Sequence, residues 1–202
     1  MSIRPRIILG LTLFLLGLIP AGRATTVAAP EFDDLVTSAD YIVRASVKSV
    51  SAEWRENQGR KYIATRVALD IIEIIRGIPP QPLVLELVGG RVGNEELVIE
   101  GAPKFLLGDD VILFVQGNGR QIYPLVAIMH GLYPVMKDEK SQQEYVLRSN
   151  GLPLYSEQEV SLPIGAMSAA KAGNPAALPL TARNFIQKIR MVSPLAAHRT
   201  VR

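Results

Sequence analysis

Two consecutive stretches of the chain alternate apolar and polar residues with a period of two, and each stretch changes phase once. In the first, the apolar residues occupy odd positions over 41–47 and even positions over 50–54. In the second, they occupy odd positions over 63–71 and continue at Ile72 and Ile74. Such alternation indicates a β-strand, and a phase change within a strand indicates a β-bulge, which bends it.

Two long bent strands followed by shorter ones predict a mainly β fold, organised as a small bent antiparallel barrel. Bent strands let a sheet curl and cover its own edges, so we favour a closed or half-closed barrel over a flat sandwich. The polar stretch 56–60 predicts the turn between the two long strands. Further strands are expected at 83–87, 97–99, 111–115, 121–127, 132–136 and 145–148.

Helical spacing flanks the strand region on both sides. Residues 30–36 predict a short N-terminal helix with its apolar residues on one face. On the C-terminal side, Thr181 is a candidate N-cap for an amphipathic helix over 182–192, whose other face is basic. We expect this helix to dock on the body of the protein, residues 25–159, which is acidic with 13 Lys and Arg against 19 Asp and Glu. The alternative is that residues 181–192 contact a membrane surface or a partner.

The first 24 residues have the three parts of a secretory signal peptide: a basic start, an apolar run and small residues before Thr25. The apolar run, 7–19, is shorter than the roughly 20 residues needed to cross a bilayer. We therefore predict a signal peptide over 1–24 and a periplasmic or secreted location, with no transmembrane segment after cleavage. An uncleaved anchor is the alternative.

Charge and composition divide the remaining chain. We predict a β-barrel domain over 25–150, a linker or arm rich in Pro, Gly and Ala over 151–180, and a basic helix and tail over 181–202. Three of the 22 Lys and Arg residues lie in 1–24, which leaves 19 against 19 Asp and Glu in the mature chain. Nucleic-acid binding favours a basic excess, so we expect no nucleic-acid partner.

The order of these features resembles the netrin-like domain, the OB-fold barrel of tissue inhibitors of metalloproteinases. The resemblance covers 38–116 and is carried by 38–47, 62–77, 83–87 and 103–114. It implies an OB-like barrel and suggests a protease inhibitor. In those inhibitors an N-terminal cysteine chelates the target's zinc, whereas this chain has no cysteine, so no inhibitory residue carries over. The chain is also similar to small exported bacterial proteins of unassigned function.

The sequence holds no complete catalytic set. Its two histidines are His130 and His198, and no G-x-S-x-G motif occurs. The adjacent acids of 95–96 and 109–110 point to opposite faces of a strand and make no acid–base pair. We assign no catalytic residue, no metal site and no cofactor. A hydrolase that uses His130 stays open as an alternative.

Four residues are candidates for ligand contact. Trp54 and Tyr62 flank the predicted first hairpin, where exposed aromatic rings could stack on sugars or bases. Arg91 and Asn94 lie in the glycine-rich stretch 88–94, which opens no helix and is expected to be a flexible loop at the barrel mouth. We predict a non-enzymatic exported binding module whose partner is another exported protein.

Overall fold

A computed structural model describes residues 29–163, 166, 168, 173–174 and 176–192. The predicted signal peptide, the new N-terminus at Thr25 and the end of the basic tail with His198 lie outside the described residues. Among the described residues, no helix has the length and apolar character to span a bilayer.

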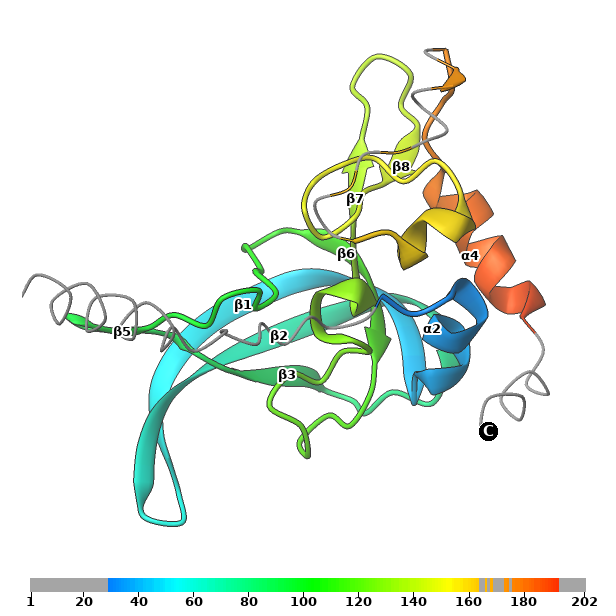
Figure 1. Cartoon of the computed structure of the whole chain (residues 1–202). Coiled ribbons are helices and arrows are strands. Elements are labelled where there is room, and N and C mark those ends of the chain that lie inside the picture. The colour runs from blue at the N-terminus through cyan, green and yellow to red at the C-terminus, as the bar shows by residue number, and fades with distance from the viewer. Residues whose placement is uncertain (1–28, 164–165, 167, 169–172, 175, 193–202) are drawn as a thin grey trace, which may run out of the picture.

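The structure is mainly β, as predicted (Figure 1). One antiparallel sheet has the order β3-β2-β1-β6-β7-β8, and a separate hairpin joins β4 to β5. The strands are β1 (Tyr41–Asn57), β2 (Arg60–Gly77), β3 (Leu83–Val88), β4 (Gly90–Val92), β5 (Glu95–Leu97), β6 (Asp110–Val115), β7 (Leu132–Lys137) and β8 (Glu144–Val146). The helices are α2 (Phe32–Ser38) and α4 (Ala182–Met191), with 3-10 turns η1 (Ile128–Gly131) and η2 (Glu157–Ser161).

The register between β1 and β2 shifts at three places. Lys48 in β1 and Ile72 and Ile75 in β2 stand opposite no partner residue. The shifts at Lys48 and Ile72 confirm the two phase changes seen in the sequence. Each bulge bends the ribbon, and the two long strands curve visibly in Figure 1.

The curled sheet does not close into a barrel, since β3 and β8 are its two edges. The strand expected at 121–127 is absent, and only Leu125 forms an isolated bridge. Pro124 has no N–H to donate, and Ala127 and Ile128 have φ values of 47° and 59°, which an extended strand excludes. The strand expected at 97–99 is also wrong, because β5 ends at Leu97.

A loop covers the edge of β3 where a closing strand was expected. The Asn118 side-chain amide donates to the Val84 carbonyl at 3.0 Å, and the Tyr123 hydroxyl donates to the Val88 carbonyl at 3.2 Å. These bonds satisfy two outward carbonyl groups of β3 without extending the sheet.

Alternate residues of β1 and β6 point into two separate cores. The inner core lies on the concave face and includes Val43, Val47 and Leu113. The outer core lies between the other face and the helices, where Ile42 and Phe114 meet α2 and α4. In the outer core the rings of Phe114, Tyr133, Phe185 and Phe32 form contacts with centroids 5.1 to 6.1 Å apart.

The C-terminal helix docks on the body, as we favoured. Phe185 and Ile189 of α4 are fully buried in the outer core. The predicted N-cap is present, because the Thr181 hydroxyl accepts a 3.2 Å hydrogen bond from the Asn184 N–H. Membrane contact by residues 181–192 would require this apolar face to leave the core.

The chain between β8 and α4 also packs on the body over part of its length. Leu154 is fully buried and Val160 of η2 is nearly so. The buried Arg148 guanidinium donates to the carbonyl oxygens of three residues further along the chain: Leu162, Pro163 and Ala166. The first twelve or so residues of the linker or arm predicted over 151–180 therefore form an ordered strap over the outer core.

Candidate functional site

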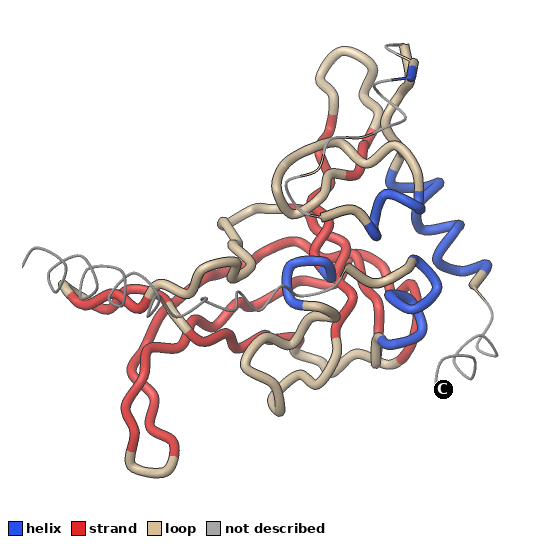
Figure 2. Tube along the Cα trace, in the orientation of Figure 1, coloured by secondary structure: helices blue, strands red, loops and turns tan. Residues whose placement is uncertain are grey.

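The two long strands continue past both cores as a two-stranded arm, which we define as residues 49–66. β6 pairs with β1 only over 41–46, and β3 pairs with β2 only over 64–69. The arm ends in a two-residue turn at Gln58 and Gly59, whose φ values of 51° and 74° suit a tight hairpin. Figures 1 and 2 show the arm projecting away from the helices.

The arm carries both aromatic candidates, on opposite faces. Trp54 pairs with Ile63, so these two share the concave face, and Tyr62 points to the other face. Trp54 is 44% exposed and lines an open cavity of about 710 Å³ with Arg55, Glu56, Lys61 and Glu95. Tyr62 lines a different cavity of about 720 Å³, beside the loop that covers β3. The two rings therefore form no single stacking surface.

Arg91 and Asn94 lie in an ordered hairpin, so the flexible loop expected over 88–94 is wrong. Arg91 stands opposite Glu96 and forms an ion pair with it at 2.5 Å, while Asn94 is exposed in the turn. The hairpin is anchored to the arm by the Gly89 N–H, which donates to the Ile63 carbonyl at 2.8 Å. It crosses the same face of the arm as Trp54, because Gly90 approaches Thr65 and Ala52 on that face and Glu95 from β5 lines the Trp54 cavity.

Gly90 explains why this stretch is rich in glycine. A Cβ at this position would collide with the Thr65 hydroxyl and lie 3.1 Å from the Cβ of Ala52. Its φ of 129° is also a conformation that residues with a side chain rarely adopt. Here glycine permits the close approach of β4 to the arm rather than flexibility.

An apolar cleft of about 340 Å³ adjoins the arm at its base. It lies between the concave face of the sheet and the chain that follows β5, and its charged lining residues are Glu96 and Lys104. Val50, Ile99 and Leu106 are exposed apolar residues of its lining, and Val98 is exposed as well. The sequence analysis missed this cleft, although the exposed pair Leu106 and Leu107 just before Gly108 was a visible signal.

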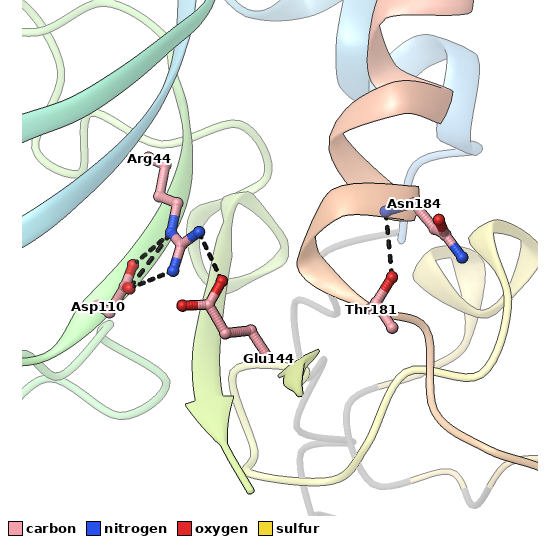
Figure 3. A network of polar contacts seen from close by, with 5 residues as sticks. All are labelled: Arg44, Asp110, Glu144, Thr181 and Asn184. Carbon is pink, nitrogen blue, oxygen red and sulfur yellow. Dashed lines mark hydrogen bonds and ion pairs between the residues drawn. The ribbon is translucent and has the colours of Figure 1, made fainter. Parts of the chain in front are cut away.

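A network of charged residues lies on the opposite, outer face of the sheet (Figure 3). The Arg44 guanidinium donates to both Asp110 oxygens, with a shortest distance of 2.6 Å, and to Glu144 Oε2 at 2.9 Å. Arg44 has only 14% of its side chain exposed, and it joins β1 to β6 and β8. Hydrogen bonds to Asp110 and Glu144 raise the pKa of Arg44, and the bond from Arg44 lowers the pKa of Glu144.

This network borders a charged cavity of about 560 Å³ beneath α4. Its other charged lining residues are Glu73, Arg183 and Arg190, of which Arg190 forms an ion pair with Glu73 at 2.5 Å. Glu144 and Arg183 also line a neighbouring cavity of about 450 Å³. Arg44 is matched by carboxylates of β6 and β8, and Arg190 of α4 is matched by Glu73 of β2. We interpret the region as a clamp that ties three strands together and holds α4 on the sheet.

His130 is buried, with 6% of its surface exposed, and it lines none of the cavities described here. Burial lowers the pKa of His130, and the nearby positive charge of Arg148 lowers it further. Within the part of the chain that the structure describes, no group of three or more His, Asp and Glu side chains could hold a metal ion.

Comparison with known proteins finds no match for this chain among family models, curated proteins or solved structures. The netrin-like resemblance therefore rests on the residues of 38–116 given above.

Proposed function

We propose that this protein is a non-catalytic binding module that acts outside the cytoplasm. It would hold another exported protein on the concave face of the arm and in the adjoining apolar cleft. The observation that carries the proposal is Trp54, which lies in neither core and exposes 44% of its surface on a projecting ribbon. Tryptophan supplies a large contact area at low entropic cost and is enriched among residues that dominate binding energy.

The surroundings of Trp54 support the same interpretation. From Trp54 to the apolar cleft, the concave face carries Ala52 and Val50, and Val50 lines the cleft. Exposed apolar side chains that gather in one place mark interaction sites more often than scattered ones do. The hairpin with Arg91 and Asn94 lies beside this surface and adds polar groups, as the rim of an interface does. The netrin-like resemblance, itself a proposal, supports a binding role.

The test uses the fact that Trp54 is the only tryptophan of the chain. The protein from Thr25 onward is immobilised as wild type, as Trp54→Ala and as the control Ile78→Ala, and exported proteins of the same cell are passed over each. Ile78 is a highly exposed apolar residue in the connector between β2 and β3, outside the arm. We expect one protein to be retained by wild type and Ile78→Ala and lost by Trp54→Ala.

The retained protein, once purified, should then shift the emission of Trp54 to shorter wavelength, because binding removes water from the ring. Retention by all three forms alike would reject the arm as the site. Recovery of nothing by the wild type would reject the binding module itself.

The two other hypotheses lack support from the described residues. Inhibition of a metalloproteinase depends on an N-terminus that lies outside the described residues, and a titration against a zinc metalloproteinase at micromolar protein tests it. Hydrolysis by His130 requires a nucleophile within reach, and the structure gives His130 a buried site beside Arg148. Turnover lost in His130→Ala with unchanged melting temperature would establish it.

A further inference from the structure

Among the described residues, no strand pairs with one edge of β1 along the arm. β6 leaves β1 at Ser46, and the last described backbone bonds on this edge are made by Val47. Its N–H donates to the Asp109 carbonyl at 2.8 Å, and its carbonyl accepts from the Gly108 N–H at 2.9 Å. Between Val50 and Glu56, no backbone group on this edge is bonded to any described residue. An unpaired edge of this kind is a template for another strand.

The turn at the tip fixes which backbone groups point outward. In a two-residue hairpin the residues flanking the turn, Asn57 and Arg60, exchange both hydrogen bonds, and bonded and non-bonded pairs then alternate. Trp54 and Ile63 are therefore a non-bonded pair. The bond from Gly89 to the outward carbonyl of Ile63 agrees with this assignment. It follows that the free groups on the β1 edge belong to Val50, Ala52, Trp54 and Glu56.

We propose that two copies of this chain pair antiparallel along this edge, about a two-fold axis at Trp54, and form a continuous β2-β1-β1-β2 sheet. Trp54 would exchange both hydrogen bonds with the partner subunit's Trp54. Ala52 would do so with the partner subunit's Glu56, and the reverse pair follows by symmetry, which gives about six new backbone bonds. This inference goes beyond the proposed function, since it uses the edge of the arm rather than its concave face.

The charges of the arm select this axis. With the axis at Trp54, Glu53 lies opposite the partner subunit's Arg55, and Arg55 lies opposite the partner subunit's Glu53. Both are non-bonded positions, where opposing side chains come closest. Moving the axis by one residue would place Glu53 opposite Glu53 or Arg55 opposite Arg55, and an axis at Glu56 would oppose two glutamates. Within the unpaired stretch from Val50 to Glu56, an axis at Ala52 would set no charged residue opposite another.

The edge also lacks the usual protections against strand addition. Proline, lysine and bulges are common devices on free edges, and the stretch from Val50 to Glu56 has neither proline nor lysine. The bulge at Lys48 lies just before it and ends the part of β1 that β6 covers. The β4–β5 hairpin approaches the concave face at Ala52 and Thr65, and none of its described backbone bonds reaches this edge.

The test exchanges the two charges separately and then mixes the products. Glu53→Arg places arginine opposite Arg55 at both symmetric positions, and Arg55→Glu places glutamate opposite Glu53. A one-to-one mixture of the two variants restores two opposite-charge pairs across the edge. Sedimentation equilibrium of the chain from Thr25 onward, up to about 100 µM, measures the dimer of each sample.

We expect the wild type to dimerise, each variant alone to dimerise at least about tenfold more weakly, and the mixture to recover the wild-type dimer. Recovery in the mixture shows that neither variant has lost its fold. A monomeric wild type over this range would overturn the proposal, as would single variants that dimerise like the wild type. If wild type is monomeric but Trp54→Ala still loses an exported partner, only the dimer fails and the binding module stands.

Discussion

The two halves of the β1–β2 ribbon make the same backbone ladder and bury very different amounts of side chain. At the root, Ile42, Val43 and Ala45 are fully buried between the inner and outer cores. In the arm, beyond the bulge at Lys48, Val50 and Trp54 remain exposed although their register with β2 is unbroken. The comparison teaches that backbone pairing in the hairpin, and not burial, sets the length of these strands. Exposed side chains of the arm such as Trp54 are therefore available for contacts outside the core.

The largest expected difference between root and arm concerns the apolar residues of β1. Ile42→Ala should lower the free energy of unfolding by about 2–5 kcal/mol, because it opens a cavity in the outer core. Val50→Ala in the arm is the matched control and should cost less than about 1 kcal/mol. Urea denaturation measures both, and equal losses would contradict the division into root and arm.

Ion pairs sharpen the same comparison. Arg44→Met at the root should destabilise by about 1–3 kcal/mol, since it leaves Asp110 and Glu144 without their partner. The control is Lys48→Met at the bulge, whose ion pair with Asp70 is well exposed and should contribute about 0–0.5 kcal/mol. A loss at Arg44 no greater than at Lys48 would show that the network is not a clamp.

Attachment of the β4–β5 hairpin to the arm is tested by glycine replacement. Gly90→Ala should cost about 1–3 kcal/mol, because the new Cβ collides with Thr65 and Ala52. Gly59→Ala in the turn also meets a positive φ, of 74° against 129° at Gly90, but has no atom within 4 Å of the new Cβ, so it shows the cost of a positive φ without a collision. Thermal unfolding of the two variants should therefore rank Gly90→Ala as the less stable.

His130 and Glu144, both outside the arm, should make stability depend on pH. The folded pKa of His130 lies below its ordinary value of 6.5, so the unfolded chain binds the proton first and stability falls as pH drops below 6.5. The lowered pKa of Glu144 adds a loss below 4.5. Urea midpoints in a pH series should show the first loss in wild type and Trp54→Ala, and a reduced one in His130→Gln.

The smallest change in stability is expected at Trp54, near the tip of the arm. Trp54→Ala should change the free energy of unfolding by no more than about 1 kcal/mol, because the ring belongs to neither core. A loss of several kcal/mol would assign Trp54 a structural role and remove the main support for binding.

Periodicity predicted the long strands, their bulges and both helices, because each depends on neighbours close in sequence. The segment 121–127 failed for a different reason. Its apolar residues suit a strand, but the left-handed backbone at Ala127 and Ile128 arises from packing that no local pattern records. Gly90 misled in the same way, since its role depends on Thr65, a residue of another strand.

For the candidate site, the sequence predicted that Trp54 and Tyr62 border the first hairpin but not that they face apart. Which face each ring takes depends on the register between β1 and β2. The sequence placed the turn only within 56–60, and this left the register undetermined. The Arg44 network could not be predicted, because its partners Asp110 and Glu144 are 66 and 100 residues away in sequence. Contacts of that range require the topology of the sheet to be known.

The ring contact between Phe32 and Phe185 has a consequence for how the chain is made. It joins the first described helix to the last, with centroids 5.8 Å apart. During synthesis, the inner core can assemble from residues 41–132, whereas the outer core must wait for α4 to emerge. A nascent chain therefore lacks its outer core until α4 has been made, and truncations that remove α4 should be degraded.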